Sequence, residues 1–257
     1  MLFALLTDFG TKDYFVGAMK GTILAINENA RIVDITHEIP PQNISAASFT
    51  LRACYRCFPE KTIFVAVVDP GVGSKRRAIL VETADYYFIA PDNGLLSFIF
   101  NEEKDFRVYE ITNEEFFHHP VSRTFHGRDI FAPSAAHLSK GKNPAEFGKE
   151  IKDFVYFRES KPQKLSETHI EAEIIHIDHF GNLITNLKRE DLPRDFTLEI
   201  NNKKVNKLCN FFAEAEKDEL FMILGSAGFL EIAVFQNSAA DLLNAEVGQK
   251  VLLTLKN

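Results

Sequence analysis

Residues 64–82, FVAVVDPGVGSKRRAILVE, constrain the fold more than any other stretch of this chain. The run 64–68 is short, apolar and rich in β-branched residues, which predicts a strand buried on both faces. Pro70 and the glycines after it cannot continue a strand, so Asp69 stands at a strand's carboxyl end with Arg76 beyond a glycine-rich loop. In open α/β sheets ligands bind at this edge, although the same residues would also suit a surface hairpin with one weak ion pair.

Strand and helix patterns alternate through the first part of the chain. Apolar runs predict strands at 2–6, 31–35, 64–68, 78–81, 86–90 and 106–111, and helical spacing occurs at 14–26, 44–58 and 130–138. Such alternation is typical of βαβ units and a mostly parallel sheet. We therefore expect residues 1–160 to form an α/β domain.

The pattern changes after about residue 150. Residues 149–168 are rich in charge, which is typical of a linker. Beyond them one helical pattern, at 239–243, stands among short strand patterns at 169–177, 196–200, 220–224, 229–235 and 250–255. We expect residues 168–257 to form a small all-β domain, either barrel-like or a sandwich.

Composition argues against several classes of partner. The net charge of the 257-residue chain is −7 and no basic cluster occurs, which argues against a nucleic-acid partner. No run of 18 apolar residues occurs that would span a membrane, and the start MLFALLTDFG lacks the basic residues of a signal peptide, so we interpret it as a first strand.

The three cysteines are interpreted as free thiols, because an odd number fits a reducing cytoplasm. Cys54 and Cys57 form a C-x-x-C inside a helical pattern, and we expect buried helix thiols there. Cys209 would not complete the ligand set of a zinc site, so no metal is expected.

Two further polar residues occupy positions suited to chemistry. Asp8 follows the first predicted strand, and His126 lies in a polar turn at 124–129 that precedes a helical run. Taken alone, His126 is better explained as a capping or core histidine. Together with Asp69 and Arg76 it would lie on loops that follow separate strands of one sheet, and we expect these side chains to converge.

Six motifs, taken in order, carry a resemblance to one family. They are Thr7-Asp8-Phe9-Gly10-Thr11, Asp69-Pro70-Gly71-Val72-Gly73 with Arg76-Arg77, Pro91-Asp92-Asn93-Gly94, Phe125-His126-Gly127-Arg128-Asp129, Ile177-Asp178-His179-Phe180-Gly181-Asn182 and Gly225-Ser226-Ala227-Gly228-Phe229-Leu230-Glu231. From Leu2 nearly to its C-terminus, the chain resembles the S-adenosylmethionine (SAM) hydrolases that form adenosine. These enzymes are also called SAM hydroxide adenosyltransferases and are relatives of the bacterial fluorinase and chlorinase.

The resemblance implies an α/β domain, a C-terminal β-barrel and a homotrimer whose sites lie between subunits. It also implies that a water-derived nucleophile attacks C5′ of SAM and releases methionine and adenosine, with SAM as substrate and no cofactor. The family's catalytic triad corresponds to Asp69, Arg76 and His126. The fluorinase has a tyrosine where Asp69 stands and lacks this histidine, which favours the hydrolases.

The residue types suit this chemistry. A sulfonium is a good leaving group, so the enzyme has to supply an oriented nucleophile and not an acid. Asp69 would accept a proton from water or align it, and Arg76 would keep the carboxylate ionised and stabilise hydroxide character. His126 would complete the hydrogen bonds of the water or relay its proton.

The resemblance implies the substrate contacts as well. Asp8 corresponds to the residue that binds the ribose hydroxyls, Asp178 to the one that meets the methionine ammonium, and Asn182 to the one that reads the adenine edge. The segment at 178–180 is one residue shorter than in the fluorinase.

Aromatic and hydroxyl contacts complete the expected site. Phe180 and Phe212 would sandwich the adenine, although ordinary core packing is the alternative explanation for both. Ser226 would contact the methionine carboxylate. Ala227 replaces an arginine of the fluorinase at this point.

Two other functions remain open. The first is a halide-using adenosyltransferase, against which Asp69 counts because a carboxylate would repel a halide. The second is a non-catalytic module that binds adenosine or SAM, a task for which an intact triad is not required.

Overall fold

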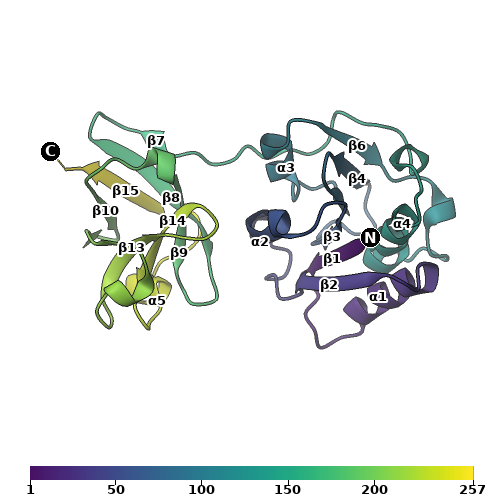
Figure 1. Cartoon of the computed structure of the whole chain (residues 1–257), viewed down its shortest axis with the longest axis horizontal. Coiled ribbons are helices and arrows are strands. Elements are labelled where there is room, and N and C mark those ends of the chain that lie inside the picture. Colours follow the sequence, from purple (N-terminus) through teal and green to yellow (C-terminus); the bar gives the residue numbers. More distant parts are fainter. Residues whose placement is uncertain (257) are drawn as a thin grey trace. The chain divides into compact units, whose positions relative to one another are not determined.

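The computed structural model describes residues 1–256, which divide into two compact units, residues 1–159 and residues from Ser160 onward (Figure 1). The first unit is an α/β structure, and the second consists mainly of β-strands. None of the helices within the described residues is long and apolar enough to cross a membrane.

A six-stranded sheet forms the centre of the first unit. Its strands, in spatial order, are β2 (Arg31–Thr36), β1 (Leu2–Thr7), β3 (Ile63–Val67), β5 (Tyr87–Pro91), β4 (Ala78–Thr83) and β6 (Phe106–Glu110). The first four run parallel, whereas β4 is antiparallel to both β5 and β6. The sheet is therefore mixed, and the expectation of a mostly parallel sheet holds only for four of its strands. The short turn between β4 and β5 explains the difference, because strands joined by a tight turn run in opposite directions.

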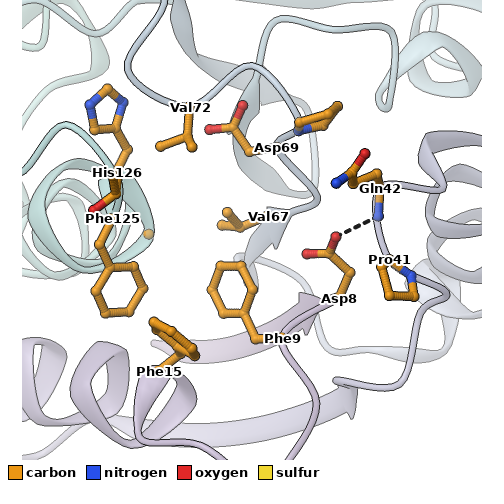
Figure 2. A pocket seen from close by; sticks show the side chains of 13 residues that line it. Asp8, Phe9, Phe15, Pro41, Gln42, Val67, Asp69, Val72, Phe125 and His126 are labelled. Atoms are coloured by element: carbon orange, nitrogen blue, oxygen red, sulfur yellow. Dashed lines mark hydrogen bonds between the residues drawn. The ribbon is translucent and has the colours of Figure 1, made fainter.

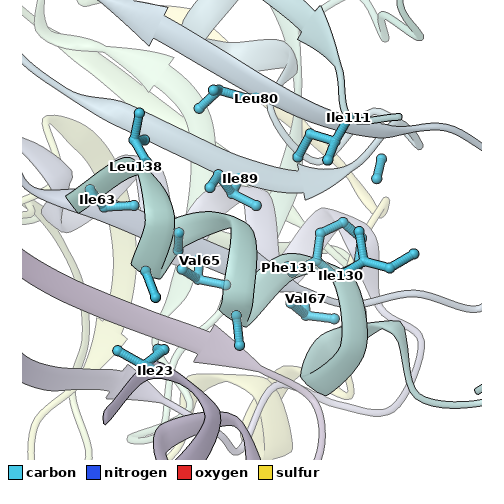
Figure 3. Packing of buried hydrophobic residues seen from close by; sticks show 14 of the residues in the cluster. Ile23, Ile63, Val65, Val67, Leu80, Ile89, Ile111, Ile130, Phe131 and Leu138 are labelled. Carbon is cyan, nitrogen blue, oxygen red and sulfur yellow. The ribbon is translucent and has the colours of Figure 1, made fainter. Parts of the chain in front are cut away.

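Helices cover both faces of this sheet. Residues of α1 (Phe15–Ile26) and α4 (Ala132–Ser139) share one apolar core with Ile63, Val65 and Val67 of β3 (Figure 3). Residues of α2 (Ile44–Cys54) and α3 (Ser97–Glu102) share the other core with Phe64 and Ala66. Strand β3 is thus buried on both faces, which its apolar run predicts.

Helix α2 ends earlier than its sequence pattern suggests. Asn43 caps its start by accepting a hydrogen bond from the backbone N–H of Ala46 at 2.9 Å. The helix stops at Cys54 and a 3₁₀ turn, Tyr55–Cys57, follows. Cys57 is exposed and Cys54 is only partly buried, so the expectation of buried thiols is wrong for Cys57.

The connection from β3 to β4 crosses the carboxyl end of β5, because β5 lies between those two strands in the sheet. The alternative of a simple surface hairpin at residues 64–82 is therefore wrong. The segment that was expected to begin a linker also packs on the first unit: the N–H of Ile151 donates to the carbonyl of Val108 at 2.8 Å, and the rings of Phe154 and Phe100 lie 4.1 Å apart.

The second unit is a curled sheet that resembles half a barrel. Its strands in order are β11 (Lys203–Val205), β10 (Phe196–Ile200), β15 (Lys250–Leu255), β8 (His169–Ile177), β9 (Leu183–Lys188), β14 (Phe229–Val234), β13 (Leu220–Leu224) and β12 (Leu208–Cys209), and β7 (Gln163–Lys164) pairs with β8. No ladder joins β11 to β12 among the described residues, so the sheet stays open. The short helix α5 (Ala239–Leu243) packs against its apolar side through Ala239 and Leu243.

Candidate active site

The structure brings Asp69, Arg76 and His126 together. Asp69 follows β3, and its side chain is only 5% exposed. Arg76 Nε donates to Asp69 Oδ1 at 2.8 Å and to Oδ2 at 3.0 Å, and Arg76 Nη2 also donates to Oδ2. The same Nη2 lies 2.8 Å from His126 Nδ1. One guanidinium thus bridges a carboxylate and an imidazole.

These contacts determine which tautomer of His126 is present. A guanidinium has only donors, so Nδ1 of the imidazole must accept the bond from Arg76. In the neutral ring Nε2 then carries the proton. Burial, and next the positive charge of Arg76, lower the pKa of His126, which favours this neutral form. His126 therefore has one N–H available for donation.

The loop that carries Asp69 and Arg76 is tightly folded. The N–H of Val72 donates to the carbonyl of Asp69 at 3.2 Å, and the N–H of Arg76 donates to Ser74 Oγ at 3.2 Å. Gly73 adopts φ +76°, and a Cβ there would collide with the carbonyl oxygen of Arg123. Only glycine fits this close approach, which joins the loop to the segment before His126.

His126 itself begins an unusual helix. A π-helical turn, Gly127–Phe131, follows it and continues directly into α4. The ring of Phe131, which is fully buried, lies 5.2 Å from the guanidinium carbon of Arg76. The helical run expected at 130–138 therefore exists, with an irregular first turn next to the candidate site.

A cavity of about 400 Å³ opens beside these residues, and Asp8, Asp69 and His126 line it (Figure 2). The rings of Phe9, Phe15 and Phe125 form an aromatic wall on one side, with ring centroids 5.1–5.9 Å apart. The cavity thus combines polar groups with an apolar surface, a combination that suits a ligand with both characters.

Sequence reasoning missed the group that orients Asp8. The backbone N–H of Gln42 donates to Asp8 Oδ2 at 2.7 Å (Figure 2). Gln42 adopts φ +64°, a conformation that is uncommon for a residue with a side chain. The pair Pro40-Pro41 before it indicated a break in the chain, but no signal in the sequence indicated this contact.

Another set of the expected residues lies in the second unit. Asp178 Oδ1 accepts hydrogen bonds from the backbone N–H groups of Phe180 and Asn182, both at 2.9 Å. Asp178 Oδ2 accepts a bond from Asn182 Nδ2 at 2.8 Å. Asp178 therefore builds the turn that presents Phe180 and Asn182.

Phe180, Asn182 and Phe212 line one cavity of about 480 Å³, together with Phe235 and Gln236. Phe180 is 73% exposed and Phe212 is 43% exposed, so ordinary core packing does not explain this pair. Ser226 is exposed in the turn between β13 and β14, and neither Ser226 nor Asp178 lines the cavity.

Sequence reasoning also missed Glu231 on β14. Burial, and next the charge of Asp178, raise the pKa of this carboxyl to about 7. The Glu231 side chain packs closely against Gly225, which precedes the turn at Ser226. Within residues 1–256, no group of three or more His, Cys, Asp or Glu side chains could hold a metal ion.

Comparisons with family models and known proteins point in one direction. The family model "SAM hydroxide adenosyltransferase N-terminal domain" matches residues 3–148, and the model of the C-terminal domain matches residues 172–252. The chain is 37% identical to the (R)-S-adenosyl-L-methionine hydrolase of Methanocaldococcus jannaschii over 259 residues, which cover 95% of this chain and 92% of the relative. It is 34% identical to the Thermus thermophilus protein of the same name over 255 residues, with coverage of 96% and 97%.

A fluorinase and two solved structures are also similar. The fluorinase of Actinoplanes sp. is 31% identical over 219 residues, which cover 75% of this chain and 74% of that protein. The structure of an uncharacterised conserved protein from Thermotoga maritima matches with a TM-score of 0.91 and 37% identity, covering 99% of this chain and all of that one. A conserved hypothetical protein from Thermus thermophilus matches with a TM-score of 0.80 and 33% identity, and 98% of each chain is covered.

Proposed function

We infer that this chain, which belongs to the SAM hydroxide adenosyltransferase family, is an enzyme that hydrolyses S-adenosyl-L-methionine to adenosine and L-methionine. The two relatives named as hydrolases are 34% and 37% identical to it over nearly the full length. Their names specify the (R) form of the substrate. We propose the same preference here, since the sulfonium is a stereogenic centre that a shaped cavity can distinguish.

One observation carries the mechanism: Arg76 contacts both Asp69 and His126 at the edge of a cavity. Asp69 Oδ2 accepts from both Nε and Nη2 of Arg76, whereas Oδ1 accepts only from Nε and keeps a lone pair that can accept a hydrogen bond from water. His126 Nε2–H can donate to the oxygen of the same water. An acceptor and a donor together would hold the water in one orientation.

The proposed step is an in-line displacement. The water oxygen forms a bond to C5′ while the C5′–S bond breaks, and its electron pair stays on the sulfur of methionine. The water loses one proton to Asp69 or, through it, to solvent. Arg76 stabilises the negative charge that develops on the oxygen, and holding the water in line is itself a large proximity effect. Since a sulfonium leaves without a Lewis acid, we propose that no cofactor is needed.

The substrate contacts are assigned by family resemblance, and the two cavities support those of Asp8, Phe180, Asn182 and Phe212. We propose that Asp8 binds the ribose hydroxyls, and that Phe180, Asn182 and Phe212 hold the adenine. Asp178 would meet the methionine ammonium, directly or through the turn that it builds, and Ser226 the methionine carboxylate.

We propose a homotrimer in which the first-unit cavity of one copy and the second-unit cavity of another complete one site. The support is that the expected residues are divided between two cavities, one in each unit. Sedimentation should then show a trimer, and a fully active monomer would refute the proposal.

The free thiols at Cys54, Cys57 and Cys209 support a cytoplasmic location.

The activity can be tested with (R)- and (S)-SAM in ¹⁸O-labelled water, followed by mass spectrometry of the products. We expect adenosine with ¹⁸O at its 5′ hydroxyl, unlabelled methionine, and a faster reaction with the (R) form. Binding of SAM without adenosine release would favour a non-catalytic module. Formation of 5′-chloro-5′-deoxyadenosine in chloride would favour a halide-using enzyme, which the carboxylate of Asp69 beside the cavity argues against.

A further inference from the structure

The turn Pro91–Gly94 lies outside the proposed mechanism. It nevertheless contacts Val68, which leads into the loop that carries Asp69 and Arg76. Asn93 Nδ2 donates to the carbonyl oxygen of Val68 at 2.9 Å, and Asn93 Oδ1 accepts from the N–H of Leu95 at 3.2 Å. Val68 is fully buried and directly precedes Asp69. Asn93 therefore bonds the peptide group from which Asp69 leaves the sheet.

The sheet register explains why these residues meet. Strands β3 and β5 are parallel neighbours, with Val65 opposite Ile89. The same register, continued beyond the ends of both strands, puts Asn93 beside Asp69. An amide at this position has a donor for the Val68 carbonyl and an acceptor that closes its own turn.

The turn that presents Asn93 is itself fixed by its neighbours. Asp92 is 5% exposed, and both of its oxygens accept bonds, Oδ2 from Arg77 Nε at 2.9 Å and Oδ1 from the N–H of Val155 at 2.7 Å. Gly94 adopts φ +92° with the ring of Phe157 against it. These contacts hold the turn in one conformation, so Asn93 has the fixed position that a positioning residue requires.

We propose that Asn93 is a positioning residue for hydrolysis: its bond to the Val68 carbonyl fixes the direction of the Asp69 carboxylate towards the attacking water. This inference rests on the proposed role of Asp69. Without the bond, the buried Val68 carbonyl loses its side-chain donor, and the Val68–Asp69 peptide group can rotate. The Asp69 carboxylate and the Arg76 guanidinium that is bonded to it would then both move. Asn93 does not line the cavity, so substrate binding should change little.

The test compares three variants. Asn93→Ala removes both bonds, and Asn93→Asp keeps the acceptor for Leu95 but has no donor for Val68. Asn113→Ala is the matched control, because Asn113 donates to the carbonyl of Glu146 at 3.0 Å and accepts from the N–H of Glu115 at 3.2 Å, and it does not line the cavity.

We expect both Asn93 variants to lose about 10- to 100-fold in kcat, with KM within about twofold, because small misplacements of a catalytic group are costly. Asn113→Ala should keep the parental kcat even where its melting temperature falls as far as that of Asn93→Ala. A parental kcat in Asn93→Asp would overturn the proposal, and so would equal kcat losses in Asn93→Ala and Asn113→Ala.

A double-mutant cycle supplies a second readout that a purely structural role would not move. In an Asp69→Ala background, measured with enzyme in excess over SAM, Asn93→Ala should change the rate by less than about twofold, because the two residues act as one unit. Additive losses would overturn the proposal. A parent protein that releases no adenosine would instead refute the proposed function itself, so the two failures are distinguishable.

Discussion

Replacement of Asp69 by alanine tests the mechanism most directly. The change removes the proposed acceptor of the water proton and leaves Arg76 with its contacts to His126 and the ring of Phe131. The hydrogen bond to water strengthens only as hydroxide character develops, so it belongs to the transition state and not to substrate binding. We therefore expect kcat to fall while KM stays nearly constant.

The size of the effect follows from two contributions. Loss of a positioned general base typically lowers kcat by a factor on the order of 10²–10⁴, which corresponds to about 3–5 kcal/mol of activation free energy. The free energy of unfolding should also fall, by about 3 kcal/mol, because the guanidinium of Arg76, whose side chain is 11% exposed, loses its paired carboxylate. Asp69→Asn separates these contributions, since the amide keeps one acceptor for Arg76 but is not a base.

The assay follows adenosine by liquid chromatography, in steady state and with enzyme in excess, and calorimetry gives the stability. We expect Asp69→Asn to lose as much kcat as Asp69→Ala with a smaller loss of stability. In Asp69→Ala, where no carboxylate repels a halide, chloride should give a trace of 5′-chloro-5′-deoxyadenosine. Adenosine release at the parental rate by Asp69→Asn would refute the assignment of Asp69 as the group that activates water.

Three further outcomes follow from the structure. The positive charge of Arg76 helps to lower the pKa of His126, so Arg76→Gln should raise that pKa. The acid limb of the pH profile of the residual kcat should then move to higher pH. An acid limb that stays in place would show that the protonation of His126 does not control catalysis. Glu231 has a pKa of about 7 in the folded protein against an ordinary value of 4.5, so its contribution to stability is present below about pH 4.5 and is lost as pH rises through 7. Glu231→Gln should accordingly raise the unfolding free energy by about 1–2 kcal/mol at pH 8 and by almost nothing at pH 4.5, as thermal denaturation at both pH values would show. Phe180→Ala should raise KM for SAM by about tenfold with little effect on stability, since the ring is exposed, and an unchanged KM would remove Phe180 from the adenine site.

The sequence predicted those parts of the fold that depend on local apolar patterns. Residues 64–68 predicted a doubly buried strand, and β3 is one, because each face of the sheet needs its own apolar side chains. Strand β9 was missed because Thr185 and Asn186 interrupt its apolar pattern. Both are buried and hydrogen-bonded, Thr185 to the carbonyl of Leu230 and Asn186 to the N–H of Glu173, so tertiary contacts outweigh the local pattern.

In the candidate site, too, the sequence predicted what depends on residue type and missed what depends on tertiary contacts. The motifs indicated Asp69, Arg76 and His126, since chemistry depends on the type of side chain. The contacts made by Gln42 and Asn93 depend on backbone groups and on the spatial order of strands, which put β5 between β3 and β4. A pattern of residue types does not record that order.

The π-helical turn at Gly127–Phe131 lies between His126 and α4 and changes the direction in which His126 points relative to the side chains of α4. Each residue of an α-helix advances the side-chain direction by about 100°, so a regular helix would tie the direction of His126 to the positions that α4 buries in the core. A π turn holds one additional residue per turn and allows both directions to be set independently. Deleting one residue within this turn would leave the buried positions of α4 in place and rotate the imidazole by about a quarter of a turn or more, away from Arg76. The irregular turn thus separates the orientation of His126, a candidate catalytic residue, from the packing of α4 in the core.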